Sequence, residues 1–165
     1  MKTKLLIIGH GRHGKDTLAE LLRDDFGLKF ISSSQAAADI FIYDVLKEKY
    51  GYKTPEECYS DRSNHRAEWY DMICEYNRVD KIKLAKGILE RAGCYVGMRD
   101  KPEIDEAKKH KIFDLVVWVD ACERLPLESA DSFNITKADA DIIIDNNGTF
   151  EEFKERAFRF GSSLK

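Results

Sequence analysis

Two glycines five positions apart, followed directly by a lysine, are the residues of this sequence that point most clearly to chemistry. Gly9, Gly14 and Lys15 match the template of a phosphate-binding loop. Glycines leave backbone N–H groups bare where a polyphosphate must come close, and the lysine adds a point charge for the outer phosphates. We expect the loop amides to converge on a phosphate chain. The residues expected to contact it are Gly9, His10, Gly11, Arg12, His13, Gly14, Lys15, Asp16 and Thr17.

The residues around this loop have the pattern that it requires, a buried strand before it and a helix after it. Leu5–Ile8 is a fully apolar run, as expected for a parallel strand that is covered on both faces. Leu18 and Leu22 lie one turn apart and predict a helix over Lys15–Phe26, with Gly27 well placed to end it. The first turn of this helix would add its dipole and free N–H groups to the phosphate site.

The residue after Lys15 departs from the template, which has serine or threonine there. Asp16 takes this place and Thr17 follows one position later. Since Mg²⁺ prefers oxygen ligands, either the Asp16 carboxylate or the Thr17 hydroxyl is a candidate to hold the ion that accompanies ATP. Asp120, which follows a later apolar run, is a third candidate. A capping or turn role would also explain Asp16 or Asp120.

Composition describes a globular protein of one domain. The chain has 165 residues, of which 43% are hydrophobic and 35% charged, and its net charge of −3 gives no overall bias toward nucleic acid. The four cysteines are widely spaced without a C-x-x-C motif, as in a reduced cytosolic protein. No apolar window approaches the length of a membrane span. We therefore expect a cytoplasmic protein without a membrane partner.

Apolar runs alternate with helical patterns along the whole chain. This alternation predicts an α/β fold with a five-stranded parallel sheet and helices on both faces. We expect a single domain over residues 1–165, with a helical acceptor-side insertion at about 50–92 and an aperiodic, lid-like segment at about 121–139. The expected strands are Lys4–Ile8, Leu28–Ile31, Cys94–Met98, Asp114–Val119 and Asp141–Asp145.

Capping motifs and apolar stripes place several helices between these strands. Thr54 with Glu57, and Thr149 with Glu152, form capping boxes, and Asp61 is expected to open a further helix. The stripes that we expect to be buried are Ala37, Phe41 and Val45; Ile82, Ala85, Ile88 and Leu89; and Phe150, Phe153, Ala157 and Phe160.

The carboxyl ends of the predicted strands should gather further site residues at one edge of the sheet. Arg99 and Asp120 follow the third and fourth strands, and Asn146 and Gly148 follow the fifth. Arginine binds phosphate in two-point geometry, so Arg99 is a candidate for the acceptor or its phosphate and for catalysis. Arg124 lies in the aperiodic segment, where it would be either a lid residue over the transferring phosphate or a surface arginine.

For several other charged residues the sequence allows two interpretations. Arg62 and Arg66 fall on one helical face, which is either an acceptor-binding surface or a solvated basic one. Asp39 follows the second strand and is a candidate general base, or else a residue of a helix surface. His13 beside a phosphate would contribute charge, whereas His10 is expected to face solvent.

Missing motifs narrow the reaction class. The chain has no Asn-Lys-x-Asp guanine signature and is too short for a mechanical ATPase with its sensor elements. A small kinase remains, in which positioning and charge neutralisation do most of the work.

Three stretches resemble the small P-loop kinases of tailed phages. They are Gly9–Thr17, the strand end Gly97–Asp100 with Glu103 soon after it, and Ala140–Thr149. These enzymes are similar to deoxynucleoside monophosphate kinases and, more distantly, to dephospho-coenzyme A kinase. The resemblance implies ATP and Mg²⁺ as cofactors and places Asn146–Thr149 near the adenine. The family has an aspartate two residues before its strand-end arginine, where this chain has Gly97.

The resemblance leaves the acceptor open between two branches. One branch phosphorylates the hydroxymethyl group of hydroxymethyluracil in phage DNA, and this short chain looks closer to it. In that case Arg62, Arg66 and the lysines 81, 83 and 86 are candidate backbone contacts. The other branch phosphorylates free deoxynucleoside monophosphates. A non-catalytic nucleotide-binding module is a third possibility, and the oligomeric state is not predicted.

Overall fold

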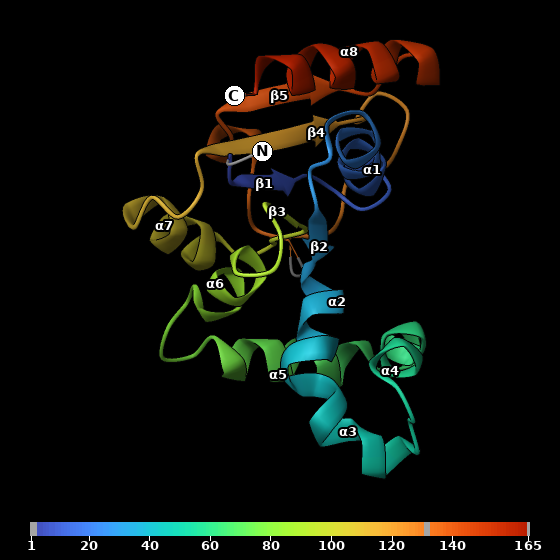
Figure 1. Cartoon of the computed structure of the whole chain (residues 1–165), viewed down its shortest axis with the longest axis vertical. Helices are drawn as coiled ribbons and strands as arrows, with labels where there is room; N and C mark the ends of the chain where they lie inside the picture. Colours follow the sequence, from blue (N-terminus) through green and yellow to red (C-terminus); the bar gives the residue numbers. More distant parts are fainter. Residues whose placement is uncertain (1–2, 131–132, 165) are drawn as a thin grey trace.

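A five-stranded parallel sheet forms the centre of the computed structural model, which describes residues 3–130 and 133–164 (Figure 1). The strand order is β2-β3-β1-β4-β5, so the strand that leads into the phosphate loop lies in the middle. The predicted α/β fold class is confirmed, and each strand lies within two residues of its expected position. The strands are β1 (Leu5–Ile8), β2 (Phe30–Ser32), β3 (Cys94–Val96), β4 (Leu115–Asp120) and β5 (Ile142–Asp145).

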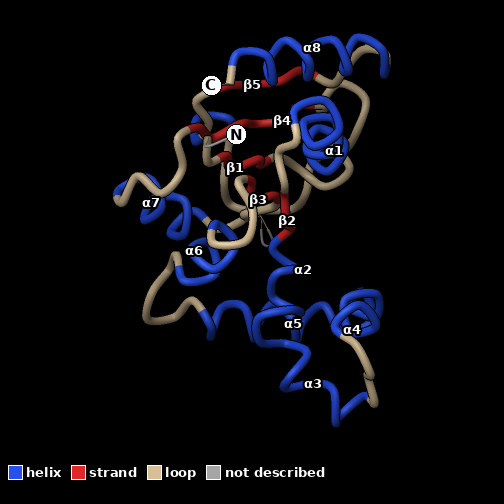
Figure 2. Tube along the Cα trace, in the orientation of Figure 1, coloured by secondary structure: helices blue, strands red, loops and turns tan. Residues whose placement is uncertain are grey.

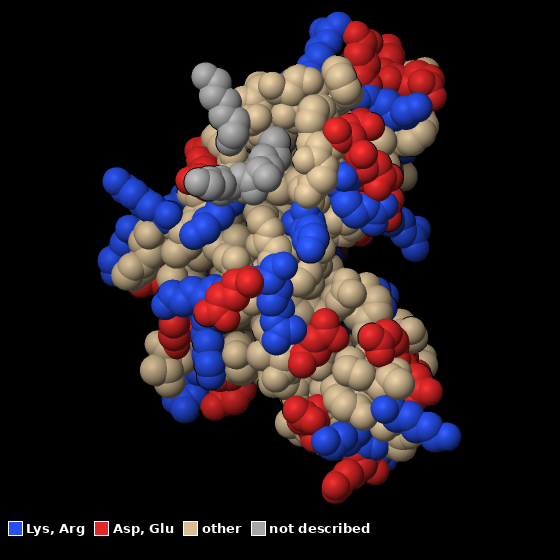
Figure 3. Space-filling model, in the orientation of Figure 1, with Lys and Arg blue, Asp and Glu red and all other residues tan. Residues whose placement is uncertain are grey.

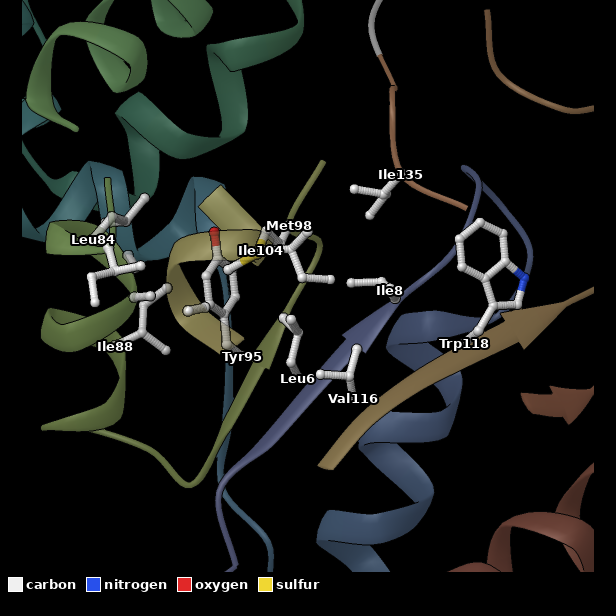
Figure 4. Close-up of a cluster of buried hydrophobic side chains, with 14 of the residues drawn as sticks. Leu6, Ile8, Leu84, Ile88, Tyr95, Met98, Ile104, Val116, Trp118 and Ile135 are labelled. Carbon is white, nitrogen blue, oxygen red and sulfur yellow. The ribbon is translucent and has the colours of Figure 1, made fainter. Parts of the chain in front are cut away.

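Helices cover both faces of this sheet because alternate strand residues point to opposite sides. Leu5 and Ile7 of β1 pack toward α1 (Lys15–Phe26) and α8 (Phe150–Ser163). The alternate residues of β1 and β4, Leu6, Ile8, Val116 and Trp118, pack on the opposite face toward α6 (Lys83–Leu89) and α7 (Lys101–Lys109). Figure 4 shows this second cluster, in which side chains from the sheet lie against residues from α6, α7 and the connecting segments. The labelled sheet residues are Leu6, Ile8, Tyr95, Val116 and Trp118, and the others are Leu84, Ile88, Met98, Ile104 and Ile135.

A helical arm, residues 33–76, projects away from the sheet (Figure 2). It has a small core of its own, made of Ala37, Ala38, Ile42, Leu46, Cys58 and Trp69. Figure 3 shows an indentation on one side between this arm and the sheet. The arm consists of α2 (Ser33–Ala37), a π-helix (Ala38–Ile42), α3 (Tyr43–Tyr50), α4 (Pro55–Asp61), a 3-10 turn (Arg62–His65) and α5 (Arg66–Tyr76).

The π-helix changes which residues of the arm are buried. Val45, expected in the core, is 62% exposed, whereas Ala38, Ile42 and Leu46 are buried. A π-turn adds one residue to the helical repeat, so the buried stripe moves by one position. Sequence periodicity assumes a regular α-helix and cannot show this shift.

Three other helix predictions need correction. Asp61 ends α4 instead of opening a helix, because its carboxylate accepts hydrogen bonds from Tyr52 and from Asn64 in the following turn. Leu84, rather than Leu89, completes the buried stripe of α6. Phe150 is 56% exposed, and its ring faces the Lys154 ammonium instead of the sheet.

Of the two capping boxes predicted from the sequence, one is complete and one is partial. Thr149 and Glu152 each accept a hydrogen bond from the other's backbone N–H. Thr54 caps α4 as expected, but the Glu57 carboxylate accepts from the amide of Lys53. Within the lid-like segment, residues 131–132 lie outside the described residues.

Candidate active site

The loop between β1 and α1 is tightly bent, and two of its positions require glycine. Gly9 has φ 141°, and a Cβ atom there would lie 2.6 Å from the carbonyl oxygen of Val119. Gly14 has φ 104°, and its Cβ atom would lie 2.5 Å from Nδ2 of Asn146. Both the left-handed backbone and the missing side chain are therefore needed. The predicted helix over Lys15–Phe26 begins directly after this bend and ends at Gly27 in the left-handed conformation.

The side chain of Lys15, the first residue of α1, is buried against the preceding loop. Its ammonium donates a 2.7 Å hydrogen bond to the carbonyl oxygen of His10. Burial, followed by the nearby charge of Arg99, lowers the pKa of Lys15 to about 8. The lysine is thus held at the loop in a setting where a negative ligand would stabilise its charged form. Asp16 is exposed and Thr17 is half-buried in the first turn of α1.

A carboxylate from the lid-like segment lies directly over the loop. Oε2 of Glu128 accepts a 2.7 Å hydrogen bond from the amide of Gly11, and Oε1 pairs with the guanidinium of Arg99. Burial alone would raise the pKa of Glu128, but Arg99, the Gly11 amide and Lys15 outweigh it and lower this pKa. Glu128 is therefore ionised at neutral pH. Sequence reasoning missed this residue, since no motif or periodicity surrounds it.

The two loop histidines fasten the same segment through their ring nitrogens. Nδ1 of the fully buried His13 accepts from the amide of Ala121, and Nε2 lies 3.0 Å from the carbonyl oxygen of Pro126. Because Nδ1 is the acceptor, Nε2 carries the proton and donates it to Pro126. Nδ1 of His10 likewise accepts from the amide of Glu128. Burial, followed by the neighbouring His13, lowers the pKa of His10, which fits the role of its ring as a neutral acceptor.

The expected adenine-side residues lie together beside the loop. Nδ2 of Asn146 donates to the carbonyl oxygen of His13 at 2.9 Å, and Nε of Arg124 donates to the carbonyl oxygen of Asn146 at 2.6 Å. The adjacent turn is joined to the lid-like segment because the Glu123 amide donates to Oδ1 of Asn147. Gly148 follows in the same turn before α8. The structure thus brings the fifth strand's end against the phosphate loop.

Asp120 has one oxygen that suits a metal ion. Oδ2 accepts from the ammonium of Lys137 at 2.7 Å and from Cys122, whereas the buried Oδ1 lacks a hydrogen-bond partner among the described residues. Burial would raise the pKa of Asp120, but Lys137 and Cys122 lower it. The described residues contain no cluster of three metal-binding side chains. Mg²⁺ uses one or two carboxylates together with phosphate and water, so the free oxygen of Asp120 is a candidate ligand for it.

The remaining candidates lie apart from this cluster. Nη1 of Arg62 donates to the carbonyl oxygen of Tyr59, and its guanidinium lies 3.8 Å above that ring, so it is engaged within the arm. Arg66 begins α5 and is exposed. Asp39 lies in the π-helix, where burial raises its pKa and the neighbouring charges are Arg91 and Glu56. Of the predicted acceptor-side residues, Arg99 is the one that the structure places at the phosphate loop.

No helix in the described part of the chain is both long and apolar enough to cross a bilayer. No protein-family model matches the sequence, and no curated protein matches it.

Two solved structures share the fold at low sequence identity. Dephospho-CoA kinase from Campylobacter jejuni superposes with a TM-score of 0.51, covers 97% of this chain and 96% of its own, and is 16% identical. The protein TT1252 from Thermus thermophilus gives a TM-score of 0.51 over 100% of both chains at 14% identity. This chain therefore has a P-loop kinase-like fold.

Proposed function

We propose that this protein is an ATP-dependent phosphotransferase that moves the γ-phosphate of ATP to a deoxynucleotide-type acceptor. One observation carries the proposal: the Gly11 amide and the Arg99 guanidinium both bind the Glu128 carboxylate, and the charge of Lys15 lies close to it. A phosphate suits such a set of donors and charges. The fold shared with dephospho-CoA kinase supports the proposal at the level of architecture.

In this proposal the protein promotes transfer by positioning the phosphates of ATP and by neutralising their charge. The loop amides and Lys15 hold the outer phosphates, and Arg99 neutralises the charge that spreads over the transferring group. Asn146 lies on the adenine side of the loop, and Arg124, predicted as a lid residue or a surface arginine, donates to the carbonyl oxygen of Asn146. Asp120, Asp16 and Thr17 are the residues that would hold Mg²⁺, which supplies further neutralisation of the phosphates when bound. Asp39, the candidate general base expected from the sequence, lies in the π-helix of the arm apart from the loop, so the proposal assigns it no step.

For the acceptor, our first choice is the hydroxymethyl group of hydroxymethyluracil within DNA. The resemblance of Gly9–Thr17, Gly97–Asp100 and Ala140–Thr149 to phage enzymes supports this choice. The target base would have to leave the duplex stack to reach the loop. The indentation between the arm and the sheet is a surface that could receive it (Figure 3).

A free deoxynucleoside monophosphate is the second candidate, and the distribution of charge favours it. Lys86 pairs with Asp80, and the ammonium of Lys83 lies 4.1 Å above the ring of Tyr76, so these lysines have partners within the protein. On the face shown in Figure 3, basic and acidic side chains are interspersed. A small acceptor would need Arg99 and few further charges, whereas a polymer is bound best along a continuous basic groove.

The experiment that tests the proposal measures transfer of labelled phosphate from ATP. Wild-type protein and Lys15→Ala are incubated with hydroxymethyluracil-containing DNA, with matched thymine DNA, and with each deoxynucleoside monophosphate. We expect label in one acceptor class with wild-type protein and none with Lys15→Ala. Label that appears only in monophosphates would select the second candidate. Tight ATP binding without transfer to any acceptor would instead support a non-catalytic nucleotide-binding module.

A further inference from the structure

We propose that Glu128 is an internal competitor of ATP: its carboxylate occupies the position of an outer phosphate, so nucleotide binds only after Glu128 has left the loop. This inference rests on the proposed function, because it concerns the same phosphate site. It adds that the ATP-free protein holds its own loop closed through residues 121–128, which we call the strap.

The contacts of Glu128 are those expected of a bound phosphate oxygen. One carboxylate oxygen accepts from the loop amide of Gly11 at 2.7 Å, and the other pairs with Arg99 in the segment between β3 and α7. The carboxylate lies so close above the loop that a Cβ atom on Gly11 would be 3.3 Å from Cδ of Glu128. A phosphate and this carboxylate cannot use the Gly11 amide at the same time.

The strap is held by the phosphate loop itself. The amide of Ala121 donates to His13, the ring of His13 donates to the carbonyl oxygen of Pro126, and the amide of Glu128 donates to His10. These hydrogen bonds link loop and strap at both ends of the strap. Because His10 holds the backbone amide of Glu128, movement of the strap away from the loop breaks this hydrogen bond as well as the contacts of the carboxylate.

Both cations at the loop have a partner in this closed arrangement. Arg99 has the Glu128 carboxylate as its partner, and the Lys15 ammonium is bonded to the carbonyl oxygen of His10. The side chain of Glu128 is 24% exposed, so its contacts are partly protected from water. When ATP enters, its outer phosphates would take over the partners of Glu128. The observed affinity for ATP is then the affinity of the open form multiplied by the fraction of molecules in which the strap is open.

Equilibrium binding of ATP to the full chain tests this inference. Glu128→Ala removes the carboxylate, and Glu128→Gln removes its charge while keeping its shape. Glu20→Ala, an exposed position on α1, controls for the change in net charge. Because hydrogen bonds to charged groups are among the stronger ones, we expect Glu128→Ala to tighten ATP binding by about 10-fold or more. Glu128→Gln should have a smaller effect in the same direction, and Glu20→Ala should bind as the wild type does.

Two further ligands locate the effect. Inorganic tripolyphosphate should gain affinity in Glu128→Ala as ATP does, whereas AMP, which lacks the outer phosphates, should not. Equal ATP affinity in wild type and Glu128→Ala, weaker binding in Glu128→Ala, or an equal gain for AMP would each overturn the inference while leaving the proposed function in place. If neither wild type nor the folded Glu128 variants bound ATP, the proposed function would fail and this inference with it.

Discussion

Glu128 and Gly11 are 117 positions apart in the chain, yet the carboxylate of the first accepts a 2.7 Å hydrogen bond from the amide of the second. This contact shows that the phosphate loop is shaped to bind an anion, because its amide and the nearby Arg99 already hold one. It also means that the loop is not open in the described structure. Under our proposal, nucleotide binding exchanges one anion for another.

The lowered pKa of Lys15 predicts that ATP binding weakens in alkaline solution. Below about pH 8 the lysine is charged both with and without ATP, so affinity should be constant. Above it, the ATP-free protein loses the proton and ATP must restore it, so the dissociation constant should rise by up to about tenfold per pH unit. Calorimetry from about pH 7 to 9.5 measures this slope, and Lys15→Met should abolish it. A flat wild-type profile would show that Lys15 does not face the phosphates.

The lowered pKa of Lys15 also predicts how the free energy of unfolding of the ATP-free protein depends on pH. This free energy should rise with pH, whereas the affinity for ATP should fall. Between pH 8 and the unfolded value of 10.5, the unfolded chain keeps a proton that folded Lys15 has lost. The free energy of unfolding contributed by this residue should therefore rise with pH over that range. Denaturant titrations of wild type and Lys15→Met at several pH values would isolate the contribution, which should be missing from the variant.

Gly14 and Gly27 lie at opposite ends of α1 and offer a matched pair of substitutions. Both have positive φ, 104° and 71°, but a Cβ atom on Gly27 meets nothing within 4 Å. Gly27→Ala should lower the free energy of unfolding by about 1–2 kcal/mol, the cost of the left-handed backbone. Gly14→Ala should cost more, and it should also abolish ATP binding because Asn146 must move. Equal costs in thermal denaturation would contradict the close packing at Gly14.

Removing the ring of His13 should destabilise the connection between loop and strap. His13→Ala leaves the buried amide of Ala121 and the carbonyl of Pro126 without their partner. An unsatisfied buried group costs about 1–3 kcal/mol, and we expect a loss of unfolding free energy of at least this size. His110→Ala is the control and should be nearly neutral, because this side chain, directly after the end of α7, is 52% exposed. Similar values for both variants would argue against the buried anchor.

Arg99 should matter more for transfer than for folding. Arg99→Ala is expected to lower kcat/KM by about 100-fold, the usual loss when one charged donor is removed from a developing anion. Arg99→Lys should restore part of this loss, because it keeps the charge and loses the two-point geometry. Arg159→Ala on α8, 76% exposed, is the control. Unchanged kinetics in Arg99→Ala would contradict a role for Arg99 in phosphate transfer.

The parts of the site that sequence could predict are those fixed by neighbours in the chain. The glycines at 9 and 14, the helix over Lys15–Phe26 and its end at Gly27 follow from local spacing and local backbone needs. The parallel sheet follows from the alternation of apolar runs with helices. Its strand ends then place Asn146 beside the loop, as expected.

The rest depends on contacts between distant or irregular segments. The strap has no periodicity, so nothing in its sequence shows that Glu128 reaches Gly11 or that His13 is buried under Pro126. His10 was expected to face solvent, but its ring accepts the amide of Glu128. The buried stripe of the arm was predicted for a regular α-helix, and the π-helix over Ala38–Ile42 shifts it by one position.

The central claim is that the loop before α1 binds the phosphates of ATP and that Lys15 is its main charge. Titration calorimetry of Mg·ATP into wild type and Lys15→Ala, with Lys154→Ala on α8 as the control, tests it most directly. The account predicts saturable binding of one ATP by wild type and Lys154→Ala, and a loss of at least about 100-fold in affinity for Lys15→Ala. Equal binding by all three proteins, or none by the folded wild type, would contradict it.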